Sequence, residues 1–452
     1  MPARLTELRA LARLAAPLVL GQLALMTLGV VDLVMAGTLG AVPMAALALA
    51  TTFHYALVVV AQGLLMGLDP FVAQAHGAGE HRRAGLWLLR GLVVAAVVTV
   101  PVVAVLCLGS EPALRFLGQP EELIPTAVTY LRVMAPGVLF RLVYIACRQV
   151  LQARGRVRLP LAVALVANGV NAVADYAFIH GSWGLPALGV VGVGLSTSVC
   201  DAFMGLSLLG ALLASGALAD LGIPRLREVL DPAALRRFFA VSLPLAGQTG
   251  LESWGFVSTS LMAGWLGATV VAGHQVALNL AAVVYMIPLG ISSGVVVRVG
   301  HALGRGDREG VGRAARVGLA VAAVIALCTA SLFALVPGPL AEIYTRDPAV
   351  LALAVSLLPL AAAFQLFDAL QVVGLGILRG LGDTRFPALA SVLGFWVLGL
   401  PLGGWLALRG GLGARGIWIG LALGLLIIST VVLARIAWKL ARPLARVEGG
   451  AG

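Results

Sequence analysis

Long runs of apolar residues, separated by short polar connections, dominate the pattern along this chain. Bounded by glycine, proline and charged residues, twelve such runs fall near 14–37, 44–72, 87–109, 124–151, 159–180, 188–217, 239–266, 270–298, 313–337, 348–378, 387–408 and 414–440. An α-helix needs roughly 20 apolar residues to cross a bilayer, and each run is long enough. Strands of a membrane barrel would instead alternate polar and apolar residues over shorter segments. The pattern therefore predicts an all-α integral membrane protein with twelve transmembrane helices.

The second half of the chain repeats the first half at an offset of 227 residues (262 − 35). The matches include Met35–Ala41 with Met262–Ala268, Pro17 with Pro244, Gly77–Glu80 with Gly304–Asp307, and Gly155 with Gly382. Because each half holds an even number of helices, both halves have the same orientation, as in transporters whose parallel repeats are related by an axis along the membrane normal. We therefore expect two six-helix bundles with pseudo-two-fold symmetry: an N-lobe at 1–216, a cytoplasmic linker at 217–237 and a C-lobe at 238–452.

Composition and charge agree with a membrane location. Hydrophobic residues make up 60% of the chain and charged residues only 11%, whereas a typical soluble protein has roughly 25% charged residues. The net charge of +11 does not indicate nucleic acid, because the basic residues gather at alternate connections. In total, 25 lie in or beside one set of connections and 4 in the other set. The positive-inside rule then places both termini in the cytoplasm.

Acidic residues inside apolar runs are expensive and usually functional. In the first half, Asp32 lies deep in the first predicted helix, while Asn171 and Asp175 are four residues apart and share one face of the fifth. Thr197 adds a hydroxyl at a similar depth in the sixth. Carboxylate, amide and hydroxyl oxygens suit a hard cation such as Na⁺. The two carboxyl groups could instead share a proton, or the cluster could simply fix helix packing.

The second half does not repeat this set. At the 227 offset, Thr259 takes the place of Asp32, and two leucines replace Asn171 and Asp175. Glu252 and Asp368 lie near the middle of other predicted helices and could bind a cation or a cationic substrate. Gln275 and Asn279 are again four apart and could line the same site or form hydrogen bonds between helices.

Motifs of other function classes are missing from the sequence. There is no Walker A motif, no hydrolase-like spacing of serine, histidine and aspartate, and no metal-binding or disulfide spacing of the four cysteines. We therefore expect a transporter rather than an enzyme, with no cofactor apart from a coupling ion.

Several strings together resemble the multidrug and toxic compound extrusion (MATE) family in its bacterial NorM-like branch. They are Val31–Gly37, Asn171–Asp175, Gly192–Thr197, Gly273–Asn279, Arg298–Gly304 and Leu378–Arg385. The resemblance covers nearly the whole chain. It implies an inner-membrane antiporter, working as a monomer, that exports small organic and often cationic compounds in exchange for Na⁺ or H⁺.

The resemblance also assigns residues. Asp32, Asn171, Asp175 and Thr197 match the N-lobe cation site of the family, and Glu252 and Asp368 match its C-lobe acidic pair. Phe364 departs from the pattern, since some relatives have tyrosine there, and this removes a possible hydroxyl ligand. The main alternative is a flippase or exporter of lipid-linked or polysaccharide substrates from the same superfamily. Arg132 and Arg141 keep that alternative open, because an anionic substrate needs a basic cavity.

Overall fold

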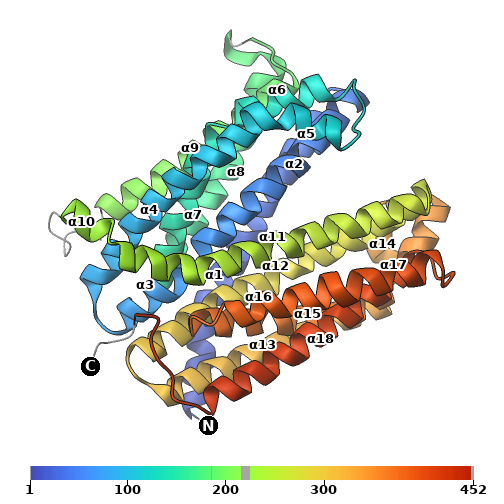
Figure 1. Ribbon diagram of the computed structural model, residues 1–452. Coiled ribbons are helices and arrows are strands. Elements are labelled where there is room, and N and C mark those ends of the chain that lie inside the picture. Colours follow the sequence, from blue (N-terminus) through green and yellow to red (C-terminus); the bar gives the residue numbers. More distant parts are fainter. Residues whose placement is uncertain (1, 185, 215–223, 449–452) are drawn as a thin grey trace. The chain divides into compact units, whose positions relative to one another are not determined.

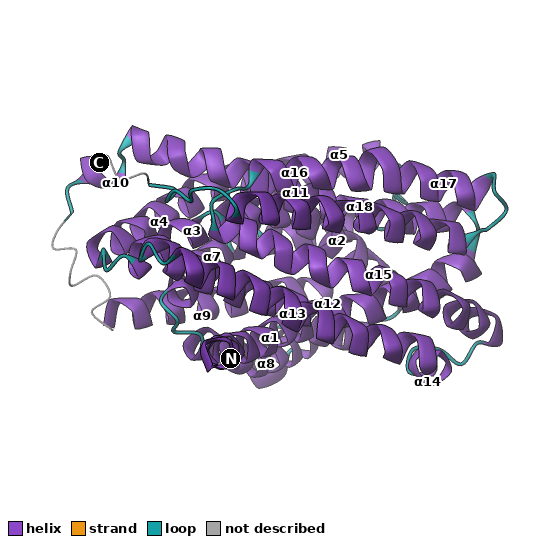
Figure 2. Ribbon diagram, turned by 90° about the horizontal axis from the view of Figure 1, so that it is seen from below, coloured by secondary structure: helices purple, strands orange, loops and turns teal. Residues whose placement is uncertain are grey.

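The computed structural model describes residues 2–184, 186–214 and 224–448, and these residues are helical with no strand (Figure 2). The all-α prediction is thus confirmed. Ten of the described helices or helix runs are long and apolar enough to cross a membrane, and the bent pair α6 (Ile124–Met134) and α7 (Gly137–Ala153) makes an eleventh. The remaining predicted span falls within α11 (Pro232–Trp265), a long helix whose polar residues include Gln248 and Glu252.

The helices divide into two compact units. Unit 2 is the continuous segment Leu20–Ala246, and unit 1 joins Met1–Val19 to Gly247–Gly452. The chain therefore passes between the units inside α1 (Pro2–Gly37) and inside α11. These units differ from the predicted lobes in two segments: 1–19 of the predicted N-lobe lies in unit 1, and 238–246 of the predicted C-lobe lies in unit 2. The lobe boundaries stay a prediction. Residues 217–223 of the predicted linker lie outside the described residues, and its role as a linker stays a prediction.

Unit 2 is built on tightly packed helix pairs, with α7 and α8 each against α9 (Figure 1). Besides its parts of α1 and α11, its helices are α2 (Ala41–Met66), α3 (Leu68–Gly77), α4 (His81–Ala104), α5 (Ser110–Phe116), α6 (Ile124–Met134), α7 (Gly137–Ala153), α8 (Arg158–His180), α9 (Val190–Ala214) and α10 (Leu226–Val229). A π-helical turn, Val105–Gly109, joins α4 to α5, and a short 3-10 turn, Ser182–Gly184, follows α8.

Unit 1 is centred on α15, which packs against three long helices, α12, α13 and α18 (Figure 1). Its helices, besides parts of α1 and α11, are α12 (Ala268–Gly304), α13 (Arg308–Leu335), α14 (Pro337–Glu342), α15 (Pro348–Gly380), α16 (Arg385–Ser391), α17 (Leu400–Leu408) and α18 (Ala414–Leu440). A π-helical segment, Val392–Gly399, joins α16 to α17.

One predicted span is broken. The run 124–151 forms α6 and α7, which meet at an angle of 51°. Pro136 precedes α7 directly; proline has no backbone N–H to donate, and its ring clashes with the preceding turn of a helix. The composition of the run is that of one span, but its backbone bends there.

Backbone geometry confirms the internal repeat. Gly40 and Gly267, which match at the 227 offset, have φ angles of 102° and 112°, and Gly79 and Gly306 have 77° and 72°. Such positive φ values favour glycine, which has no Cβ to clash with the backbone. The two halves therefore turn in the same way at matching places, as a duplicated scaffold requires.

Candidate functional site

The four residues predicted for the N-lobe site come together in unit 2. Nδ2 of Asn171 donates to Oδ1 of Asp32 at 2.9 Å. The hydroxyl of Thr197 lies 3.2 Å from Oδ2 of the same carboxylate and 2.9 Å from the backbone oxygen of Val193, and its one proton can be donated to either. These contacts join α1, α8 and α9. Asn171 and Asp175 are both at most 1% exposed. The structure thus brings the predicted residues together, and their role as a cation site stays a prediction.

Asp175 completes the cluster in a different way. Its carboxyl group is close enough to that of Asp32 for the two to share a hydrogen bond when one carries a proton. The Ser196 hydroxyl lies near this carboxyl group, but it donates elsewhere, and no hydrogen bond of normal geometry reaches either oxygen of Asp175 or Oδ1 of Asn171 from the described residues. Buried oxygens without donors are costly. A proton or a small cation would satisfy them, so the arrangement is suited to bind positive charge.

Ser196 supports this cluster and was not found from the sequence. Its hydroxyl donates to the backbone oxygen of Asn171 at 3.1 Å and lies 3.3 Å from Nδ2 of the same residue. Ser196 is fully buried, directly before Thr197 on α9. The two neighbouring hydroxyls thus contact Asn171 and Asp32 respectively, which fixes the amide and the carboxylate together.

Arg141 and Asp201 form a second charged feature of unit 2. Nε of Arg141 on α7 lies 3.0 Å from Oδ1 of Asp201 on α9, and both side chains are largely buried. Arg132, by contrast, is half exposed, and its Nε donates to the backbone oxygen of Cys107 at 3.1 Å. Both arginines that favoured an anionic substrate are therefore engaged within the protein.

Glu252 is the centre of the polar cluster in unit 1. Its Oε1 accepts three hydrogen bonds, from Nε2 of Gln248 at 3.1 Å, from Nε2 of Gln371 at 3.1 Å and from the hydroxyl of Ser391 at 2.7 Å. Three donors on one oxygen stabilise the ionised form of a carboxylate. Of the three donors, only Gln248 could be found from the sequence, because it lies four residues before Glu252 and so on the same face of α11. Gln371 and Ser391 come from α15 and α16, and no spacing within one helix indicates them.

Asp368 lies within electrostatic range of Glu252, so the structure brings the predicted acidic pair together. Its side chain is 4% exposed, and it forms no hydrogen bond or ion pair among the described residues. Phe364, one turn earlier on α15, packs edge-on against Trp418 with ring centroids 5.5 Å apart. Phe364 therefore forms an aromatic contact in the core, at the position where a tyrosine would offer a hydroxyl ligand.

Gln275 and Asn279 do not contact this acidic pair within the described part of the chain. Nε2 of Gln275 donates to the hydroxyl of Ser260 at 3.0 Å, which links α12 to α11. Nδ2 of Asn279 donates to the backbone oxygen of Gln275 at 2.8 Å. These contacts fit the interhelical alternative for Gln275, and a binding role for either residue stays a prediction.

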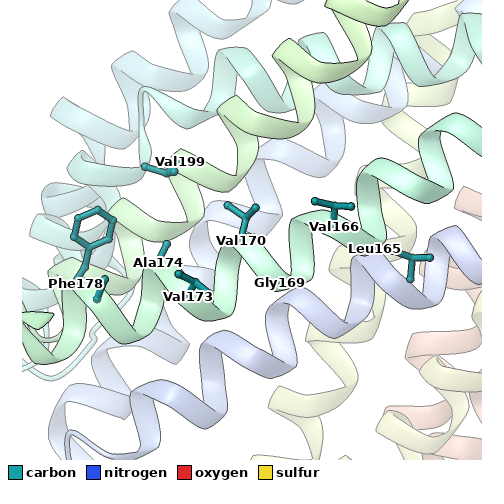
Figure 3. A pocket seen from close by; sticks show the side chains of 9 residues that line it. Leu165, Val166, Gly169, Val170, Val173, Ala174, Phe178 and Val199 are labelled. Atoms are coloured by element: carbon teal, nitrogen blue, oxygen red, sulfur yellow. The ribbon is translucent and has the colours of Figure 1, made fainter. Parts of the chain in front are cut away.

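An apolar pocket of about 610 Å³ lies on unit 2 along α8 (Figure 3). The helical spacing of its lining residues puts it on the side of α8 opposite Asn171 and Asp175. Its lining consists of Leu165, Val166, Gly169, Val170, Val173, Ala174, Ala177, Phe178 and Val199. None of these side chains is polar, so the pocket does not contain the candidate cation site.

Comparisons with known proteins follow the same two-fold organisation. The profile of the MatE family matches residues 17–177 and again residues 244–405. The chain is 37% identical to the multidrug resistance protein NorM of Burkholderia vietnamiensis over 439 residues, covering 95% of this chain and 92% of that protein. It is 34% identical to NorM of Vibrio cholerae over 434 residues, covering 95% and 94%.

Solved structures show the same fold. The crystal structure of the eukaryotic MATE transporter AtDTX14 superposes with a TM-score of 0.87 at 20% identity, covering 96% of each chain. A MATE structure in the straight conformation gives 0.87 at 19% identity, also covering 96% of each chain. The chain is a multi-pass membrane protein and belongs to the MatE family of multidrug and toxic compound extrusion transporters.

Proposed function

We propose that this protein is a secondary active multidrug exporter that expels organic cations in exchange for Na⁺ or H⁺ by alternating access. The observation that carries the proposal is the pair of neighbouring carboxyl groups, Asp32 and Asp175, buried beside the amide of Asn171. A charged group in the membrane is rare unless it has a task such as ion or proton transfer. The names of the curated relatives support the export of many small organic compounds.

The cluster in unit 2 offers oxygen ligands from three helices. Asp32 and Asp175 supply carboxylate oxygens, and Asn171 and Thr197 supply amide and hydroxyl oxygens. This donor set suits Na⁺ as a hard cation. It equally suits one proton shared between the two carboxyl groups. In either case a bound positive charge offsets the repulsion between two buried acids.

Glu252 and Asp368 in unit 1 provide a second negative centre. Because three donors already satisfy one oxygen of Glu252, we assign the ionised role to Glu252 and the exchangeable role to Asp368. A cationic compound and the coupling ion would compete for this negative charge. Inward movement of one coupling ion supplies about 2.3 kcal/mol per 100 mV of membrane potential. A monovalent cation that leaves in exchange costs the same amount, so the potential drives export only when more positive charge enters than leaves.

The distribution of basic residues supports an inner-membrane location with both termini in the cytoplasm. We further propose that the monomer is the working unit, because each internal repeat can supply one half of an alternating-access cycle. The flippase alternative is not favoured, since Arg141 is paired with Asp201 and Arg132 is bound to the backbone.

Transport by the purified protein in liposomes tests the proposal. Uptake of a fluorescent organic cation such as ethidium should follow an imposed Na⁺ or pH gradient and should stop in Asp32→Asn and Asp368→Asn. Glu309→Gln is the matched control, because Glu309 is an acid whose side chain is 89% exposed. Normal uptake by both site variants, or none by the parent under either gradient, would refute the proposal.

A further inference from the structure

A cluster of basic and aromatic side chains surrounds the end of α18. The guanidinium carbon of Arg442 lies 3.9 Å from the ring centroid of Trp438, and that of Arg435 lies 4.3 Å from the same centroid. The Lys439 nitrogen is 6.0 Å away, and Phe386 on α16 also contacts Arg435, at 4.6 Å. We call these five residues the basic aromatic cluster.

The cluster holds more positive than negative charge. Oδ2 of Asp383 accepts from Nε of Arg435 at 2.9 Å and lies 3.3 Å from Nζ of Lys439. Asp383 is therefore shared by two cations. Arg442 forms no ion pair within the part of the chain that the structure describes. Like charges at this spacing repel one another, and a second anion beside Arg442 would offset the repulsion.

The cluster also has a defined position with respect to the membrane. It stands at the end of Ala414–Leu440, a helix long and apolar enough to span the bilayer. Trp438 is 41% exposed, so its ring faces the surroundings of the protein instead of the core. Tryptophan at a helix end sits at the level of the lipid headgroups, where the phosphates lie. Clustered lysine and arginine next to a spanning helix attract anionic lipids.

We propose that the basic aromatic cluster is a binding site for the headgroup phosphate of an anionic phospholipid. Arg442 and Lys439 would contact the phosphate, while the part of the Trp438 ring that the guanidinium groups leave exposed lies at the level of the headgroups. Asp383 acts as a positioning residue, because it keeps Arg435 and Lys439 in place without neutralising the whole cluster. A soluble polyanion is less suited, since the exposed tryptophan would then face water.

Lipid binding to the full chain tests this site. Purified protein in a neutral detergent is mixed with phosphatidylglycerol or with phosphatidylcholine of the same acyl chains, and bound lipid is counted by native mass spectrometry. Each basic residue removed should weaken phosphatidylglycerol binding about fivefold. Arg442→Gln alone should therefore lose about fivefold, and Lys439→Gln with Arg442→Gln about 25-fold. Arg442 is exposed and forms no ion pair among the described residues, so the single variant keeps its fold.

The matched control removes two basic residues at other helix ends, Arg115→Gln with Arg346→Gln, whose side chains are 56% and 86% exposed. It should bind phosphatidylglycerol as the parent does, and phosphatidylcholine binding should be unchanged in every variant. Equal loss in the control, or no loss in either cluster variant, overturns the proposal. Displacement of the lipid by equimolar inorganic phosphate also overturns it, because the site would then take free phosphate. The readout does not depend on transport, so its failure leaves the proposed exporter function standing.

Discussion

The amide nitrogen of Asn171 lies 2.9 Å from a carboxylate oxygen of Asp32, so a side chain of α8 fixes the acid on α1. A hydrogen bond to a charged group is worth about 1.5–3 kcal/mol. If the carboxylate must be held in this geometry to bind the coupling ion, Asn171→Ala should weaken the apparent ion affinity by about tenfold to 100-fold. Gradient-driven ethidium uptake, titrated against Na⁺ and against pH, measures this.

The control for that experiment is Asn168→Ala, one turn earlier on α8, whose amide contacts the backbone oxygens of Ala24 and Ala164. It should keep the ion affinity of the parent. If both variants change affinity alike, helix packing rather than the contact with Asp32 explains the effect.

Glu252 and Asp368 should differ in what they contribute to folding. Replacing Glu252 with alanine leaves three donors without their acceptor, and each unsatisfied buried group costs about 1–3 kcal/mol. We expect Glu252→Ala to lower the thermal unfolding temperature in detergent markedly. Asp368→Asn, which removes no hydrogen bond among the described residues, should unfold near the parent temperature and still lose transport. Equal unfolding temperatures for the two variants would contradict this division of roles.

Arg141 and Asp201 should behave as a unit. Arg141→Gln leaves the carboxylate of Asp201, 3% exposed, without its partner, and breaking a buried pair in this way costs about 3–5 kcal/mol. The yield of folded protein by gel filtration should fall sharply. Asp201→Asn combined with Arg141→Gln should recover most of that yield, because no buried charge is then unpaired. A double variant as poor as the single one would show that the pair is needed for something other than charge balance.

Gly290 is a point of close helix approach within unit 1. A Cβ at this position would lie 2.6 Å from the backbone nitrogen of Val19, and backbone cannot move aside as a flexible side chain can. Gly290→Ala should therefore cost about 1–3 kcal/mol of stability. Gly21→Ala is the matched control, since its Cβ would meet nothing within 4 Å. Thermal unfolding of both variants checks the difference; a stable Gly290→Ala would mean that α1 can shift along α12.

The sequence predicts well those features that lie within a single helix and those that the internal repeat duplicates. Buried acids stand out against apolar runs, and Asn171 with Asp175 shares a face because four residues make about one helical turn. It does not predict which helices meet. Ser391 contacts Glu252 across 139 positions of the chain, and Arg141 pairs with Asp201 across two helices. Such contacts depend on three-dimensional packing, which a single sequence does not encode locally. The bend at Pro136 was missed because hydropathy averages over a break of two residues.

The chain passes between its two units after Val19 and after Ala246, and this affects how the protein can be divided into two fragments. Residues 20–246 form an insertion within unit 1, and the chain enters and leaves it two or three residues after Pro17 and Pro244. Two fragments divided at 215–223 would therefore each carry a helical arm belonging to the other: 1–19 in the first and 224–246 in the second. Neither fragment alone holds all of one unit. Coexpressed halves should then assemble by exchanging these arms, and each arm supplied as a separate peptide should compete with that assembly.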